Sequence, residues 1–375
     1  MSLSRRNFIR NALYGVAGLA LGRRVSAQPF NDELVLENTH NVAIPRGCQL
    51  RLVAESSQQV MASSSYNWHA APDGGACFVT ADNGWIYVSN SELRNNRGGV
   101  GALRFNASGE VIDAYPILTG TSRNCAGGRT PWQTWLSCEE NGDTGLVYEC
   151  DPTGQQAARV RPAMGAFNHE AVAVDPQSSI CYMTEDVKDG CLYRFVPSQK
   201  NNLEHGRLEV AVANRQTLSW QPLPDASGSN TPTRYQVEEA TRFKGGEGIV
   251  YDRRKVYFTT KIDNVVWCYH IDTGVITRIY SAAQYQDPLL TGVDNIEVSA
   301  SGEVLIAEDG GNMQIIALDH DYTPYILLQV FGQDRSEITG PAFSPDGQRL
   351  YFSSQRGRTG NSEDGLTYEL RFPVN

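Results

Sequence analysis

The chain has 375 residues, of which 41% are hydrophobic and 20% are charged, and this composition is typical of a globular protein with a large core. Its formal net charge of -10 argues against a nucleic-acid partner, because such a partner needs a basic surface. The 35 glycines and 17 tyrosines favour an all-β chain with many tight turns.

The first 27 residues have the layout of an export signal. Arg5 and Arg6 precede an apolar run at 12–21, and small residues at 25–27 offer a cleavage site. The paired arginines resemble a twin-arginine (Tat) signal, so we expect Tat export machinery as a partner and a periplasmic or secreted protein. The alternative is a short membrane anchor, but crossing a bilayer takes about 20 apolar residues, so we expect no stable anchor.

A register recurs along the chain, in which a polar residue opens a short apolar run. Glu170 stands fifteen residues before Glu185, and Asp294 stands fifteen before Asp309. Repeats of this kind are typical of stacked supersecondary units. The other starts in the same frame are Cys125, Glu247, Gly340 and, in the blurred first repeat, Asn67.

Each unit has the pattern of consecutive β-hairpins. An apolar run, a turn of Asp, Pro, Gly or Ser and a β-branched or aromatic run follow one another, as at 343–352 and 298–306. Further strands are predicted at 190–195, 265–269 and 314–318. Because three to four strands make a propeller blade, the sequence predicts an all-β, six-bladed β-propeller, with five or seven blades as alternatives.

Residues 28–375 are predicted to form one propeller domain. The starts at Glu170 and Glu247 are 77 residues apart, whereas Glu247 and Asp294 are 47 apart. The longer gap contains a segment at about 200–236 that is rich in Asn, Gln, Ser, Pro and Thr. We interpret it as a surface loop over the mouth of the channel, and we expect a monomer because nothing in the sequence demands a partner subunit.

The register also predicts a metal site. The inner strands of a propeller line its central channel, so residues at one register position converge there. Carboxylates are hard ligands that suit Ca²⁺ and Fe³⁺, whereas a thiolate favours iron, zinc or copper. For one acid alone, a solvated turn residue is the simpler interpretation, and for the cysteine alone a buried apolar residue or a disulfide. The converging residues are Cys125, Glu170, Glu247 and Asp294.

Other polar residues near the register have two interpretations. Acidic residues at the ends of second strands, such as Glu140 and Asp186, either support metal ligands or sit in blade-edge turns. His169 is either a ligand contact or a structural histidine, and Arg123 and Lys244 are candidates for binding an anion. The sequence contains no G-x-S-x-G, H-E-x-x-H or P-loop motif, which disfavours the corresponding chemistries.

Two segments resemble the PhoX-type alkaline phosphatase family. They are 123–140, which contains Asn-Cys-Ala-Gly-Gly and Ser-Cys-Glu-Glu, and 167–171, which reads Phe-Asn-His-Glu-Ala. The resemblance extends over essentially the whole mature chain. It implies a six-bladed propeller, exported by the twin-arginine route, whose calcium and iron ions hydrolyse the esters of small phosphorylated substrates.

The resemblance also implies roles for individual residues. Cys125 would bind iron, and Glu170, Glu247 and Asp294 would hold iron and calcium. Asn90, in the segment Asn-Ser-Glu, would be a further metal ligand or phosphate contact. Beyond binding metal, the residues assigned a catalytic role are Glu170, Glu247 and Lys244.

One departure from the family concerns the residue that contacts phosphate. The family places an arginine two residues before its third acidic ligand, but this chain has Gly245 there, with Lys244 one residue further back. A lysine binds phosphate as a point charge, without the two-pronged contact of arginine. The function predicted is a periplasmic, metal-dependent phosphoric ester hydrolase. The alternatives are a calcium-only propeller with a binding or lactonase-like role, and a metal-free interaction propeller.

Overall fold

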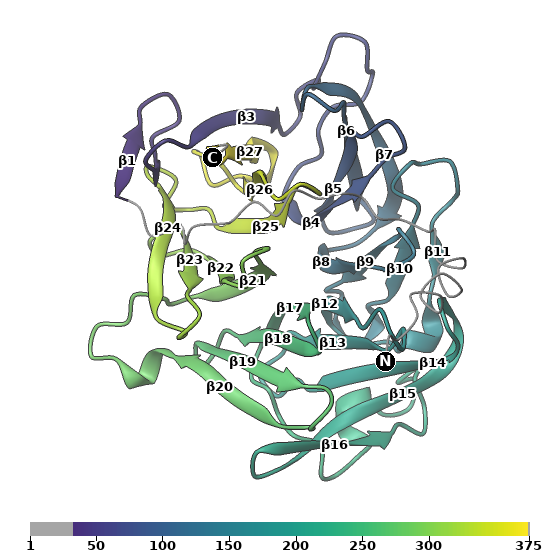
Figure 1. Cartoon of the computed structure of the whole chain (residues 1–375). Helices are drawn as coiled ribbons and strands as arrows, with labels where there is room; N and C mark the ends of the chain where they lie inside the picture. Colours follow the sequence, from purple (N-terminus) through teal and green to yellow (C-terminus); the bar gives the residue numbers. More distant parts are fainter. Residues whose placement is uncertain (1–32, 374–375) are drawn as a thin grey trace, which may run out of the picture.

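The structure is a computed structural model that describes residues 33–373, and these residues form a ring of six β-sheets (Figure 1). Within them, helical structure is limited to short 3-10 turns, and no helix is long and apolar enough to cross a membrane. The predicted all-β, six-bladed propeller is therefore confirmed, and the five- and seven-bladed alternatives are wrong. The predicted signal at 1–27 lies outside the described residues. The 3-10 turns are η1 (Gly142–Thr144), η2 (Pro162–Met164), η3 (Thr233–Tyr235), η4 (Ala282–Gln284) and η5 (Ser362–Asp364).

Each blade is an antiparallel sheet whose strands follow one another outward from the channel. The first three blades are β4 (Pro72–Val79), β5 (Trp85–Ser91), β6 (Gly98–Phe105) and β7 (Val111–Thr121); β8 (Asn124–Arg129), β9 (Trp135–Glu139), β10 (Val147–Cys150) and β11 (Arg159–Val160); and β12 (His169–Val174), β13 (Cys181–Glu185), β14 (Leu192–Gln199), β15 (Asn202–Asn214) and β16 (Thr217–Pro222).

The remaining three blades complete the ring. They contain β17 (Gly246–Asp252), β18 (Lys255–Thr260), β19 (Val265–His270) and β20 (Ile276–Ser281); β21 (Val293–Val298), β22 (Val304–Glu308), β23 (Gln314–Leu318) and β24 (Pro324–Val330); and β25 (Ile338–Phe343), β26 (Arg349–Ser354) and β27 (Leu366–Arg371).

The N-terminal strands fasten the last two blades. β3 (Gln49–Glu55) pairs with β27 and supplies the outer strand of the last blade, next to the C-terminal end of the chain (Figure 1). β2 (Val42–Pro45) pairs with β24, and β1 (Leu34–Glu37) pairs with β2. The last blade thus combines strands from both ends of the chain, and this pairing closes the ring.

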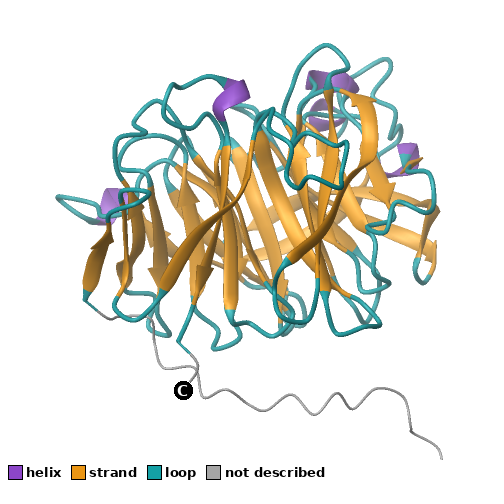
Figure 2. Cartoon of the chain, turned by 90° about the horizontal axis from the view of Figure 1, so that it is seen from above, coloured by secondary structure: helices purple, strands orange, loops and turns teal. Residues whose placement is uncertain are grey.

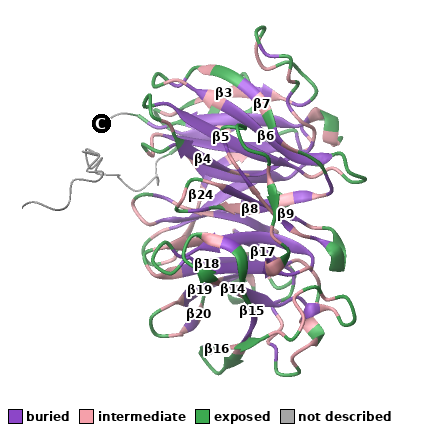
Figure 3. Ribbon diagram, turned by 90° about the vertical axis from the view of Figure 1, so that its right-hand side faces the viewer, coloured by how far each residue is buried: buried purple, intermediate pink, exposed green. Residues whose placement is uncertain are grey.

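The blades pack against one another through their faces. β22 and β23 are buried along their whole length, which explains why residues 304–307 and 315–318 are continuous apolar runs rather than alternating ones. Figure 2 shows the connecting loops gathered at the two ends of the strands, and Figure 3 shows exposed residues concentrated in those loops and outer strands. The later residues of the inner strands line a cavity of about 440 Å³.

Most of the predicted strands are present, and one predicted loop is present only in part. The strand at 314–318 is β23, and those at 265–269 and 190–195 fall on β19 and the start of β14. We expected a surface loop at about 200–236, but residues 202–222 form the long outer hairpin of β15 and β16, and only residues 223–236 form a loop, which contains η3. Polar residues in the hairpin belong to edge strands, whose outward faces are exposed to solvent.

Candidate metal centre

Every inner strand contains a β-bulge close to its start. In β12, for example, His169 pairs with Glu185 and Val172 pairs with Met183, so two residues of β12 face one residue of β13. The pairings of β4, β8, β17, β21 and β25 shift in the same way. A bulge redirects the side chains next to it, and here it occurs at the same position in all six blades.

The first residue of each bulge lies at the register position that the sequence predicted. Four of these residues are Cys125, Glu170, Glu247 and Asp294, as expected, and in the last blade the position is Gly340. In the first blade the prediction of Asn67 was wrong, because Asn67 only bridges Gln59, outside the named strands. We name as the bulge ring the residues Asp73, Cys125, Glu170, Glu247, Asp294 and Gly340.

A second set of polar residues follows the second strand of each blade. Glu92 follows β5, so the segment Asn-Ser-Glu runs over the end of that strand. Asp82, fifteen residues after Asn67, lies in the exposed turn between β4 and β5. We name as the strand-end ring the residues Glu92, Glu140, Asp186, Lys261, Asp309 and Gln355.

Three bulge-ring carboxylates form one candidate cation site, which we call the Glu170 group. Glu170, Glu247 and Asp294 each offer an oxygen within 4.8 Å of the others, and all three are buried. The Asn295 amide donates to Asp294 Oδ1 at 2.9 Å, and Thr184 Oγ1 donates to the carbonyl of Glu247 at 2.5 Å. One hydrogen bond within β21 and one between β13 and β17 therefore hold the group before any ligand binds.

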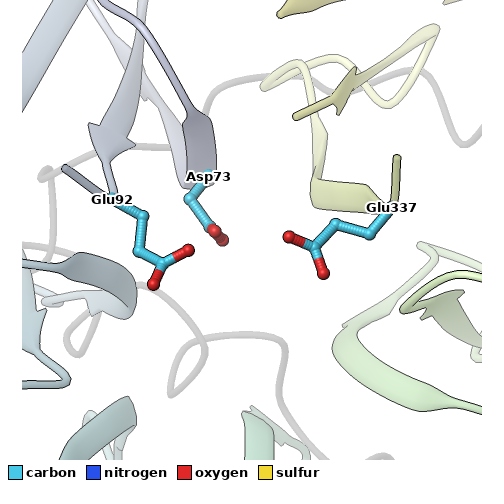
Figure 4. A group of neighbouring side chains, drawn as sticks. All are labelled: Asp73, Glu92 and Glu337. Atoms are coloured by element: carbon cyan, nitrogen blue, oxygen red, sulfur yellow. The ribbon is translucent and has the colours of Figure 1, made fainter. Parts of the chain in front are cut away.

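A second candidate site, the Asp73 group, consists of Asp73, Glu92 and Glu337, whose oxygens also lie within 4.8 Å of one another. Figure 4 shows their side chains converging from two sides of the channel. Gln355 Nε2 donates to Asp73 at 2.6 Å and to Glu92 at 3.0 Å, and Arg356 binds Glu337 at 2.7 Å. The sequence reasoning missed this group because its first blade was out of frame.

Cys125 lies between the two groups. Its Sγ atom is 3.3 Å from Glu170 Oε1 and 3.9 Å from Asp73 Oδ2. Cys125 is not part of a disulfide, so the thiol is available as a ligand. One soft ligand is thus placed where two sets of hard oxygen ligands meet.

The electrostatics of these residues favour bound cations. Burial, together with the neighbouring Glu247 and Asp294, raises the pKa of Glu170 well above its usual range. Burial and Asp309 raise the pKa of Asp294 to about 7. Burial also raises the pKa of the Cys125 thiol, and the Asp73 and Glu170 carboxylates add to that shift. So many buried acids stay ionised only when positive charge lies among them.

Asn90 has a well-defined place, but it is not among the carboxylates. Its amide nitrogen donates to the carbonyls of Cys125 and Ala126 at 3.1 and 2.7 Å. Its amide oxygen accepts bonds from Trp135 and Ser137 at 2.9 and 3.0 Å. These contacts tie β5 to β8 and β9. Asn90 therefore positions Cys125 through the backbone, and its predicted role as a metal ligand stays a prediction.

The basic residues near the mouth also differ from expectation. Lys244 is exposed, whereas Lys261 reaches inward, with Nζ 2.6 Å from Glu247 Oε1 and 2.8 Å from Asp186 Oδ2. Lys261 was overlooked because it stands fourteen residues after Glu247, not fifteen, directly after the end of β18. An alignment of strand ends, rather than a fixed offset, would have found it.

The remaining candidates have structural contacts. His169 is fully buried, its Nε2 lies 3.0 Å from the carbonyl oxygen of Gly165, and its ring stacks on Phe167. Burial lowers the pKa of His169 to about 4, which keeps the ring neutral. Arg123 donates to the carbonyl of Glu140. The structural interpretation of His169 therefore holds.

The chain matches one protein-family model over more than half of its length. The model is described as Alkaline phosphatase PhoX, and it matches residues 30–280 of the 375. No curated protein matches the sequence.

Solved structures resemble the chain at the level of the fold. A structural-genomics protein of unknown function from Bacteroides thetaiotaomicron is 14% identical with a TM-score of 0.51, and the match covers 86% of this chain and 76% of that one. A protein described as a putative gluconolactonase is 15% identical with a TM-score of 0.46, covering 88% and 94%. A calcium-binding protein, regucalcin, from Agrobacterium tumefaciens is 15% identical with a TM-score of 0.45, covering 86% and 96%.

Proposed function

The chain belongs to the alkaline phosphatase PhoX family, and on that premise we propose that it is an exported phosphoric ester hydrolase that depends on calcium and iron. The proposal places the active centre at the Glu170 group, the Asp73 group and the Cys125 thiol between them. The observation that carries it is the convergence of two carboxylate groups, buried except for the half-buried Glu92, on one cysteine.

The donor atoms suit these two metals. Carboxylate oxygens are the preferred ligands of Ca²⁺, and they also bind Fe³⁺. Calcium has no use for a thiolate, whereas iron does, so Cys125 favours a mixed set of ions over calcium alone. We therefore propose that Cys125 and Glu170 hold iron, and that calcium is held by Glu247, Asp294 and the Asp73 group.

The chemistry that such cations supply in phosphoryl transfer is neutralisation of the phosphoryl charge and activation of water. Without them, the carboxylates of the two groups would repel a phosphate ester. In this proposal Glu170 and Glu247 hold the ions against the substrate, Gln355 and Arg356 orient the Asp73 group, and burial limits the access of bulk water.

Two residues at the mouth of the channel, Lys244 and Gly245, affect which substrate could bind. The resemblance assigned Lys244 to the anion, and its exposed side chain is free to meet a phosphate at the rim. Gly245 offers no side chain there, which favours a small phosphorylated substrate held mainly by the metal ions. We further propose Tat-dependent export to the periplasm or beyond, and a monomeric enzyme.

The experiment that tests the proposal is elemental analysis of exported protein purified without chelator, beside an assay with p-nitrophenyl phosphate. Iron and calcium together with turnover would support the hydrolase. Iron and calcium without turnover would contradict the monoesterase activity and point to a different ester. Calcium without iron or turnover would replace the proposal with the calcium-only propeller.

A further inference from the structure

The strand-end ring contains one basic residue. In four blades the residue after the second strand is acidic, and in the last blade it is Gln355. In the blade of β17 to β20 it is Lys261, whose ammonium lies 2.6 Å from Glu247 and 2.8 Å from Asp186. A positive charge thus stands at a position where neighbouring blades present carboxylates.

Both carboxylates that Lys261 contacts are largely buried, with side-chain exposures of 3% for Glu247 and 12% for Asp186. They come from adjacent blades, so the ammonium bridges the seam between β13 and β17. Two carboxylates this close around one point favour a cation there, and carboxylate oxygens are among the ligands of divalent ions such as Ca²⁺.

The stem of Lys261 is held in place by the chain before β17. Its backbone N–H donates to the carbonyl of Gly245 at 2.8 Å. Gly245 has φ of +66°, and a Cβ there would lie 3.1 Å from Lys261 Cγ and 3.2 Å from Asp186 Oδ1. The space beside Gly245 is therefore already taken by the lysine stem and by its partner.

We propose that Lys261 is a built-in cation, which takes the place of one divalent metal ion between Glu247 and Asp186. The proposal deepens the proposed function. It rests on one premise of that function, that the channel binds divalent ions, and does not depend on the reaction those ions serve. A tethered ammonium supplies one charge and three N–H donors, so it satisfies both carboxylates at half the charge of Ca²⁺. Lys261 thereby lowers by one the number of divalent ions that the channel holds.

The test compares calcium binding in the full-length protein and in Lys261→Met, which keeps the length of the stem and removes the charge. Lys188→Met is the matched control, because Lys188 is an exposed lysine two residues after Asp186. Lys261→Arg keeps the charge. Each protein is dialysed against buffered Ca²⁺, and bound calcium per chain is measured by elemental analysis. Its thermal midpoint is also measured with and without Ca²⁺.

We expect Lys261→Met to bind one more calcium ion per chain than the wild type, and to gain more thermal stability from Ca²⁺. Lys188→Met and Lys261→Arg should match the wild type. If Lys261→Met folds only with Ca²⁺ present, that rescue also supports the proposal, whereas a variant that Ca²⁺ does not rescue overturns it. Unchanged or lower calcium stoichiometry in folded Lys261→Met overturns it as well. These outcomes do not depend on phosphatase turnover, so the two proposals can fail separately.

Discussion

The Sγ atom of Cys125, on β8, lies 3.3 Å from the Oε1 atom of Glu170, on β12 of the next blade. The two residues open the bulges of adjacent inner strands, so the contact follows from the propeller repeat itself. Because burial raises the pKa of both groups, the thiol and the carboxyl each keep a proton until a cation replaces it. Substitution in this pair is therefore the most direct test of which metal ions the channel binds.

Cys125→Ala should abolish iron binding and leave most of the calcium in place, because the Asp73 group and Glu170 group keep their oxygens. The loss of one sulfur atom should cost about 1 kcal/mol of stability or less. Iron and calcium are measured by elemental analysis, and the fold by circular dichroism. Cys268→Ala, which removes a fully buried thiol outside the site, should keep its iron. Wild-type iron in Cys125→Ala would rule out the assignment.

Asp73→Asn should lower calcium content, since the amide removes one charge from the Asp73 group while keeping the size of the side chain. The expected loss is about one ion per chain, measured by elemental analysis after dialysis. Asp82→Asn is the control, because Asp82 lies in an exposed turn and pairs with Arg104 at 2.6 Å. Equal calcium in the two variants would remove Asp73 from the site.

Glu247→Gln should lower calcium content and phosphatase turnover together, because Glu247 belongs to the Glu170 group. We expect turnover to fall at least tenfold with p-nitrophenyl phosphate. Glu239→Gln, at an exposed position before β17, should behave as the wild type in both measurements. A Glu247→Gln protein with normal calcium and turnover would place this residue outside the site.

Glu308→Gln should stabilise the protein at alkaline pH but not at acidic pH. Glu308 is 1% exposed, one of its oxygens accepts the Thr291 N–H, and burial raises its pKa to about 7. Folding raises the pKa of Glu308 from 4.5 to about 7, so stability falls as the pH rises through that window, because the unfolded chain releases this proton first, and the full cost is present above pH 7. The variant avoids that cost, so we expect a gain of about 1–3 kcal/mol at pH 8. Urea unfolding at pH 5 and 8 measures it, and equal gains at both would contradict the assignment.

Gly245→Arg should destabilise the protein rather than restore a phosphate contact. The backbone at Gly245 has φ of +66°, which costs a residue with a Cβ about 1–2 kcal/mol. The new side chain would also displace Lys261 or Asp186. Thermal unfolding should show a lower midpoint than in Lys244→Arg, where the side chain is exposed. A Gly245→Arg protein of wild-type stability and higher turnover would show that the mouth accepts an arginine.

Much of the fold could be predicted from the sequence because it is repetitive. The shared register of Cys125, Glu170, Glu247 and Asp294 reflects one bulge position in successive blades, which local sequence encodes. The apolar runs of strands such as β23 identified the middle of each blade. Residues 202–222 were misjudged because an exposed edge hairpin has the same polar composition as a loop.

The sequence by itself determined which residue types stand at the register, and therefore that acids and one thiol line the channel. Only the tertiary structure decided which of them meet. Asp73, Glu92 and Glu337 lie far apart in the chain, and Lys261 reaches Asp186 across a blade boundary. The physical reason is that closing the ring brings strand ends from different blades into contact, and strands of unequal length shift each end by a residue or more. A constant number of residues after the bulge therefore does not locate the strand ends, whereas the hydrogen-bonded register of each blade does.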